Sequence, residues 1–317
     1  MTHPVAARLD APLLSADRLA AQAVVNACHP VNRLEGADAI RSGLIEPLRR
    51  AFPDAIERID ICLSGSFAGG QWTASYGAFT GVFRAPLFGI GASGRLAALR
   101  YGRFDRWEHG EIVELFMILD LPALMLETGQ WPLAAPMGPA LAPPPATRDG
   151  IVVHDDPEAG ARSLALVEAM IAALMRYDGQ SRASMRMVDF WHRDFCWYGP
   201  GPIGSFQGHA DYQRGHQRPF LAAFPDRVGG DHRCRIGAGA YVASTGWPSI
   251  RATHSGGDWL GLAPTARPVT MRVMDFWRRE DALLKENWVL IDIPDLLLQL
   301  GVDPFERARA LRGGEGS

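Results

Sequence analysis

Seven residues in the first half of the chain have the spacing of a phosphate-binding loop. The stretch GIGASGR at 89–95 spells G-x-G-x-x-G, which holds a dinucleotide pyrophosphate when it joins a strand to a helix. The helix is essential because the phosphates bind at its N-terminus. The element directly after the motif therefore decides whether this chemistry is available.

Sequence patterns for other chemistries do not occur. The sequence has neither H-x-x-x-H nor H-E-x-x-H, and His209 and His216 are about 10 Å apart along a helix, too far for one metal ion. The nucleophile pattern G-x-S-x-G does not occur either. We therefore expect an activity that uses neither a metal nor a cofactor.

The chain contains an internal repeat with an offset of 172 residues. AFPD recurs at 51–54 and 223–226, and ELFMILDLPALML at 114–126 aligns with ENWVLIDIPDLLL at 286–298. One offset holds without insertion from about residue 28 to residue 132. Two tandem copies of one domain are the simplest cause.

The repeat settles the interpretation of the glycine motif. Its copy, GLAPTAR at 261–267, keeps one of the three glycines and precedes PVTMRVMDFWRR, which is rich in β-branched and aromatic residues and predicts a strand. A glycine turn that leads into a strand offers no helix N-terminus to a phosphate. We therefore expect 89–95 to be a tight turn between two strands.

Histidines distinguish the two copies, because the five in the second copy have no histidine counterpart 172 residues earlier: His192, His209, His216, His232 and His254. Imidazole titrates near neutral pH and commonly carries protons in enzymes. The second copy is therefore the candidate for chemistry. His254 is a candidate catalytic residue, although a strand histidine can also serve as a hydrogen-bonded part of the structure. His192 and Asp194, two apart on one strand face, are a candidate orienting pair.

Each copy is expected to begin with helices and end in a sheet, which makes an α+β domain. Apolar spacing predicts helices over 157–177, over 15–28 as the shorter equivalent, and over 208–227 with a break at Pro219. Strands are predicted over 190–200, 233–249, 250–261, 270–279 and 283–294.

The last predicted strand places Trp288, Leu290 and Asp292 on one face and Val289 and Ile291 on the other. Both faces are mostly apolar, so we expect helices to cover one face and the other copy to cover the second. This predicts a pseudo-dimer of two domains within one chain. If helices cover the face of Trp288, Asp292 lies in a pocket, where desolvation raises its pKa and suits it to acid–base catalysis. The alternative is that Asp292 caps the next helix.

The second copy resembles SnoaL-like polyketide cyclases of the nuclear transport factor 2-like superfamily. The stretches that carry the resemblance include WYGPGPIGSFQG, HQRPFLAAFPDR and KENWVLIDIPDLLLQLGVD within 185–305. The first copy resembles the family through LIEPLRRAFPD, GIGASGR and GEIVELFMILDLPALM, but it has NACHP in place of WYGP. The resemblance implies two tandem cone-shaped α+β barrels, each with a curved antiparallel sheet around a pocket closed by helices. It also implies a pocket aspartate, for which Asp292 is the approximate match.

The domain limits come from the repeat and from a run of prolines. We expect a first domain over 12–133, degenerate and structural, a Pro/Ala-rich linker over 134–156, and a second domain over 157–312 that holds the active site. Four aromatic residues are candidates to line its pocket, with core packing as their alternative role: Trp197, Tyr198, Trp259 and Trp288.

The resemblance implies an enzyme that moves a proton on a small hydrophobic carbonyl or polyketide-like compound, by aldol cyclisation or isomerisation. The alternatives are water addition of the epoxide hydrolase type and a non-catalytic protein that binds small molecules or serves as a scaffold. The sequence leaves the substrate open, and also whether two chains pair.

The bulk composition excludes several classes of partner. The 317 residues carry a formal net charge of -3 and a pI near 6.3, which gives no general attraction to nucleic acids or membranes. No apolar run is long enough to span a membrane, and the start of the chain lacks a signal pattern. Four widely spaced cysteines favour reduced thiols, so we expect a cytoplasmic protein.

Overall fold

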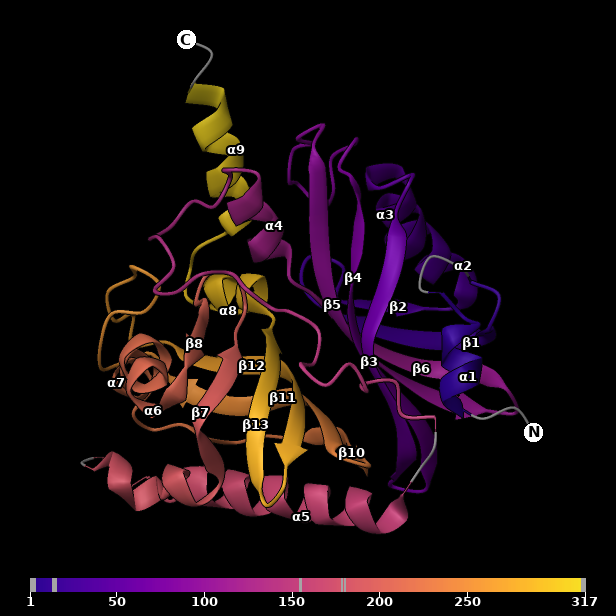
Figure 1. The fold of residues 1–317 in the computed structure, drawn as a ribbon. Helices are drawn as coiled ribbons and strands as arrows, with labels where there is room; N and C mark the ends of the chain where they lie inside the picture. Colours follow the sequence, from indigo (N-terminus) through magenta and orange to yellow (C-terminus); the bar gives the residue numbers. More distant parts are fainter. Residues whose placement is uncertain (1–3, 13–15, 154–155, 178, 180, 315–317) are drawn as a thin grey trace.

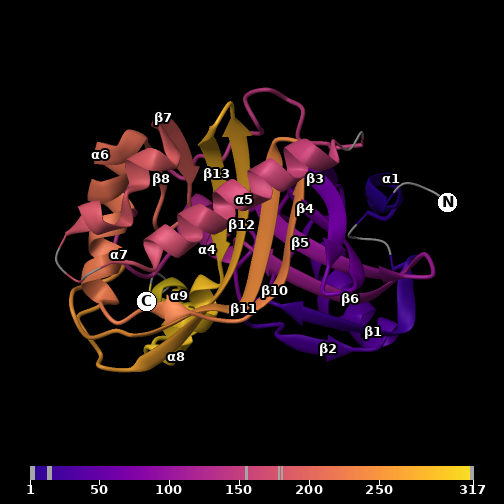
Figure 2. The same ribbon diagram turned by 90° about the horizontal axis from the view of Figure 1, so that it is seen from below.

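A computed structural model describes residues 4–12, 16–153, 156–177, 179 and 181–314. Each half of the chain forms one sheet with its own helices, and the two sheets lie side by side (Figure 1). Helix α5 runs beneath the second sheet and crosses its strands obliquely (Figure 2).

The elements of the first half are α1 (Pro4–Leu9), β1 (Leu19–Ala27), β2 (Arg33–Glu35), α2 (Ala37–Ile40), the π-helical turn η1 (Arg41–Ile45), α3 (Glu46–Ala51), β3 (Ile56–Phe67), β4 (Gly70–Val82), β5 (Leu96–Glu108), β6 (Glu111–Leu119) and α4 (Leu121–Glu127). Between Glu127 and Pro157 the described residues form no helix or strand, apart from a bridge between Ile151 and Cys62.

The elements of the second half are α5 (Pro157–Leu174), η2 (Arg182–Met185), η3 (Met187–Asp189), β7 (Trp191–Tyr198), β8 (Ser205–Gln207), α6 (Gly208–Tyr212), the π-helical turn η4 (Gln213–Gln217), α7 (Arg218–Ala223), β9 (Val228–Gly229), β10 (His232–Ala238), β11 (Tyr241–Thr253), β12 (Pro268–Glu280), β13 (Leu283–Ile291), α8 (Ile293–Gln299) and α9 (Pro304–Gly314).

Both sheets have the same topology. The first has the strand order β2-β1-β6-β5-β4-β3, and the second has the equivalent order β8-β7-β13-β12-β11-β10, with β9 beside β11. In each sheet the last long strand returns parallel to the first, and the other pairs are antiparallel. This confirms two tandem α+β domains, and the glycine stretch 89–95 lies in the connection between β4 and β5, as predicted.

Four predicted elements differ from the structure. Within the stretch expected as a helix over 15–28, Leu19–Ala27 form strand β1, because Val24–Ala27 pair in parallel with β6. The segment 233–249 forms a hairpin, because Gly239, with φ of 54°, turns β10 back into β11. Of the separate strand expected over 250–261, residues 250–253 are the end of β11 and the remainder is the connection to β12. Around Pro219 the helix continues, and its irregular turn is η4, just before the proline.

The interface between the domains is built from the faces of the two sheets. The rings of Phe104 and Phe276 lie 5.5 Å apart, and Tyr76 lies 6.3 Å from Trp288. At Gly102 a Cβ atom would lie only 2.8 Å from a methyl group of Leu290, so glycine permits the close approach of the sheets. The predicted pseudo-dimer within one chain is therefore confirmed.

Candidate functional site

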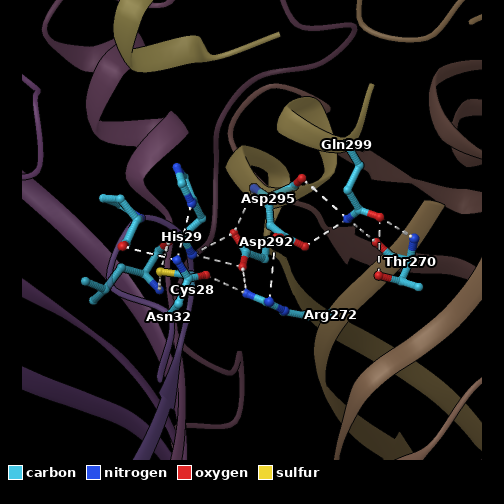
Figure 3. Close-up of polar contacts among 10 residues, drawn as sticks. Cys28, His29, Asn32, Thr270, Arg272, Asp292, Asp295 and Gln299 are labelled. Carbon is cyan, nitrogen blue, oxygen red and sulfur yellow. Dashed lines mark hydrogen bonds and ion pairs between the residues drawn. The ribbon is translucent and has the colours of Figure 1, made fainter. Parts of the chain in front are cut away.

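Asp292 lies at the domain interface, at the start of helix α8 (Figure 3). Its carboxylate accepts hydrogen bonds from the backbone N–H of Asp295 at 3.2 Å and of His29, in the other domain, at 3.0 Å. Arg272 Nη1 lies 3.0 Å from Oδ2. Burial and the neighbouring Asp295 raise the pKa of Asp292 to about 7, while Arg272 and the two N–H groups act in the opposite direction.

The helices of the second domain cover the face of β13 that carries Val289, so the condition that would place Asp292 in a pocket is not met. Trp288 and Leu290 belong to the core shared with the first domain, whereas Asn287, Val289 and Ile291 line a cavity. Asp292 does not line this cavity. Its contacts match the alternative role, a cap of helix α8 that also ties the two domains together. Its catalytic role stays a prediction.

The cavity lies in the second domain and has a volume of about 220 Å³. Strands β11, β12 and β13 form one wall, and α5 together with the α6–η4–α7 segment forms the other. Most of its lining is apolar or aromatic, including Met170, Met185, Trp191, Trp197, Phe220, Met271 and Trp277. Such a cavity suits a small, hydrophobic molecule.

A carboxyl group stands on the sheet side of this cavity. Asp275, on β12, accepts a hydrogen bond of 3.3 Å from the side-chain amide of Asn287 on the adjacent strand β13. Burial raises the pKa of Asp275 to about 7, against the smaller opposing effects of Asn287 and Arg235. Near neutral pH this carboxyl group therefore exists in both protonation states, as acid–base catalysis requires.

Several polar residues line the cavity outside the sheet, among them Tyr212, His216, Gln217 and Arg227. His216 and Gln217 end the π-helical turn η4 and line the cavity. The His216 ring stacks on Trp197 with 4.2 Å between ring centroids, and burial lowers its pKa to about 3. His216 is therefore a neutral imidazole at physiological pH.

The other predicted polar residues lie away from the cavity. His254 is buried, and its Nε2 lies 3.1 Å from the carbonyl oxygen of Gly257, which matches its alternative structural role. His192 contacts the carbonyl oxygen of Glu280, and Asp194 forms an exposed ion pair of 2.7 Å with Lys285. His192 and Asp194 thus use different partners, and neither lines the cavity.

Of the four predicted pocket aromatics, Trp197 lines the cavity. Tyr198 and Trp288 pack together at the domain interface, with ring centroids 5.4 Å apart, and Trp288 Nε1 donates to the carbonyl oxygen of Pro143. Trp259 packs edge-on against Phe224 in the core of the second domain. Core packing, the alternative role, describes these three.

The sequence reasoning missed Asp275, Asn287 and Gln217, although the repeat contained the signal. Moving back by 172 residues replaces them with Arg103, Leu115 and Ile45. These positions show the same asymmetry between the copies that marks the five histidines of the second copy. The same comparison, applied to every polar residue on the predicted strands and helices, would have flagged these positions too.

In the first domain an ion-pair network occupies the position equivalent to Asp275. Arg103 Nε lies 2.7 Å from Asp105, and the buried Arg8 of helix α1 donates to Glu57 at 2.9 Å and to the Tyr101 hydroxyl at 3.2 Å. Side chains of the chain itself therefore fill this part of the first domain.

Neither a metal site nor a membrane-spanning helix occurs within the described residues. No group of three or more His, Cys, Asp or Glu side chains there is arranged to hold a metal ion. No helix in the described ranges is both long and apolar enough to cross a membrane.

A family model described as SnoaL-like polyketide cyclase matches residues 11–128 and 165–300. A search of curated proteins found no match. One similar solved structure is AclR of Streptomyces galilaeus, named as a candidate hydroxylase. The two share 26% sequence identity with a TM-score of 0.36, and the match covers 45% of this chain and 97% of AclR. Another is IdmH of Streptomyces antibioticus, named as a candidate polyketide cyclase. The two share 26% sequence identity with a TM-score of 0.33, and the match covers 43% of this chain and 98% of IdmH.

Proposed function

Because this chain belongs to the SnoaL-like polyketide cyclase family, we propose that it is an enzyme that moves a proton on a small hydrophobic carbonyl compound. The reaction is an intramolecular aldol cyclisation or an isomerisation. It takes place in the cavity of the second domain, over 157–312. The first domain, over 12–133, is a structural partner joined through the linker 134–156.

The observation that carries this proposal is the position of Asp275. It is a carboxyl group in an apolar cavity, with its pKa raised by burial to about 7. In ionised form it removes a proton from the carbon next to a substrate carbonyl and leaves an enolate. In an aldol closure the enolate carbon forms a bond to a second carbonyl carbon. The resulting alkoxide then takes the proton back from Asp275.

Proton transfer beside a carbonyl requires no redox group, so we propose that the reaction is independent of a cofactor. Hydrogen-bond donors stabilise the negative charge that develops on the enolate oxygen. The cavity offers Ser244, the indole N–H of Trp191 and the amide of Gln217 for this purpose. Its mostly apolar lining lowers the local polarity, which strengthens these interactions.

Two other functions are compatible with the same cavity. Water addition of the epoxide hydrolase type would use Asp275 to activate a water molecule, with the adjacent Asn287 to position it. A protein that only binds or carries a small molecule would use the apolar walls alone. Neither function would exchange protons on the carbon next to the carbonyl group of a ketone.

Deuterium exchange tests the proposal without knowledge of the natural substrate. In D₂O at pH 7.5 the protein should accelerate exchange at the acidic CH₂ of 2-tetralone, a flat aromatic ketone, measured by NMR. Asp275→Asn should lower the protein-dependent rate by about 100-fold or more. Asp292→Asn should keep most of the protein-dependent exchange rate if Asp292 is a cap. Asp194→Asn, at an exposed position, serves as the control. No acceleration, or an unchanged rate in Asp275→Asn, would contradict the proposed function.

A further inference from the structure

The helical wall of the cavity carries a buried carboxamide without a partner. Gln217 is 4% exposed and lines the cavity. Neither its Oε1 nor its Nε2 has a hydrogen-bond partner among the described residues. A buried amide is normally paired at both ends, because it has lost its hydrogen bonds to water. A bound molecule would supply the missing partners.

The repeat shows that the fold does not require an amide at this position. The counterpart of Gln217 is Ile45, which ends the equivalent π-helical turn η1 and is 2% exposed in the core. The same local structure is therefore compatible with an apolar side chain. π-Helical turns are often found at functional sites. The second copy has a polar group where an apolar one fits, which points to a binding role.

A second buried donor lines the same cavity. The indole N–H of Trp191, on β7, has no partner in the part of the chain that the structure describes, and Trp191 is 4% exposed. Buried tryptophans usually place this group against an acceptor. The cavity therefore offers unpaired donors and an unpaired acceptor within a mostly apolar lining.

We propose that Gln217 selects the ligand of this cavity through a pair of hydrogen bonds. Its Nε2 donates to a ligand carbonyl, and its Oε1 accepts from an N–H or O–H next to that carbonyl. The ligand is mostly apolar, and it carries one neutral group with adjacent acceptor and donor, as in a carboxamide, a lactam or an enolised dicarbonyl. An anionic carboxylate is disfavoured, because it has no N–H or O–H to donate to Oε1 of Gln217. Charge does not decide the choice, since Arg227 lines the cavity as well as Asp275.

This inference rests on the proposed function in one respect, that the cavity is the ligand site. It is tested by binding, which is independent of turnover. The probes are 1-naphthamide and 1-acetonaphthone, which have nearly the same shape but differ by an NH₂ in place of a CH₃. Calorimetric titration of the full chain should show 1-naphthamide binding about tenfold tighter, the effect of one added hydrogen bond to a buried partner.

Gln217→Met, which keeps the length of the side chain, should reduce this preference to about twofold or less. The matched control is Met170→Leu, which changes the shape of the same cavity but no hydrogen bond and should keep the tenfold preference. The melting temperature of Gln217→Met should equal or exceed that of the wild type, since an unpaired amide is removed. Gln217→Leu provides a second variant with the same expectation.

Three results would overturn the inference: equal binding of the two probes by the wild type, a preference that persists in both Gln217 variants, or a failure of both probes to bind. Asp275→Asn separates it from the proposed function. One outcome is that Asp275→Asn keeps the preference for 1-naphthamide over 1-acetonaphthone while neither the wild type nor the variant accelerates exchange of 2-tetralone. In that case the recognition role of Gln217 holds and the proposed reaction fails.

Discussion

Asp292 and Asp120 make equivalent contacts across the domain interface. Asp292 pairs with Arg272 and accepts a hydrogen bond from the backbone N–H of His29 in the first domain. Asp120 pairs with Arg100 and accepts one of 3.1 Å from the backbone N–H of Gly201 in the second domain. Arg100 and Asp120 lie 172 positions before Arg272 and Asp292. Gly201 lies 172 positions after His29. Two related clusters therefore fasten the two domains together.

The first prediction concerns the stability provided by these clusters. Asp292→Ala removes a helix cap and one partner of a buried ion pair, so it should lower the free energy of unfolding by about 2–5 kcal/mol. Asp292→Asn keeps an oxygen for the cap and should cost less. Urea unfolding measures both, with the exposed Asp38→Ala as the control. Equal stability of Asp292→Ala and the wild type would show that the cluster contributes nothing.

The second prediction concerns the pH dependence of activity. As a general base, Asp275 acts in its ionised form, and burial raises its pKa to about 7. The value of kcat/KM for tetralone exchange should therefore rise between pH 5 and pH 8, with a midpoint near 7, and then level off. A rate that is constant over this range would contradict the assignment of Asp275 as the base.

The third prediction concerns the pH dependence of stability. The pKa of Asp275 is raised in the folded protein above its value of about 3.9 in the unfolded chain, so the folded state binds the proton more tightly. The contribution of Asp275 to stability must then fall as the pH rises from about 4 to about 7. Asp275→Asn removes this loss. Relative to the wild type, the variant should gain ~1–4 kcal/mol in free energy of unfolding between pH 4 and pH 8.

Chemical denaturation of both proteins at several pH values provides the measurement for Asp275. The groups that act on its charge, Asn287 and Arg235, are present in both proteins, so the difference isolates the carboxyl group. Parallel curves of stability against pH for variant and wild type would contradict the raised pKa.

The fourth prediction concerns the network inside the first domain. Arg8 is fully buried and contacts Glu57, Ser75 and Tyr101. Arg8→Met removes one partner of a buried ion pair and should lower the free energy of unfolding by about 3–5 kcal/mol. Naphthamide binding by the second domain should not change. The control, Arg33→Met, breaks an exposed pair with Glu35 and should cost about 0–1 kcal/mol.

The fold was largely predictable from the sequence because the repeat fixed the number of domains and aligned their strands. Strand β1 was not, because it contains many small residues, and its burial alternates clearly only from Ala23 onward. Its conformation depends on pairing with β6, which lies about 90 residues later in the chain. Local apolar spacing contains no information about that partner.

The site was harder to predict than the fold. Alternation on β13 separated Trp288 from Val289 correctly, but both faces are apolar, so the pattern could not tell which one the helices cover. That choice depends on how the two sheets pack, including the close approach at Gly102. The pocket position of Asp292 depended on helices over the face of Trp288, whereas the cavity lies on the other face, with Asp275 and Asn287 in its lining.

The connection between Glu127 and Pro157 has a thermodynamic consequence. Because it joins the two domains covalently, each meets its partner at an effective concentration that does not change on dilution. A two-chain dimer with the same interface would dissociate at low concentration, and its melting temperature would depend on concentration. Here the association of the two sheets is a unimolecular step, so their pairing persists however scarce the protein is in the cell.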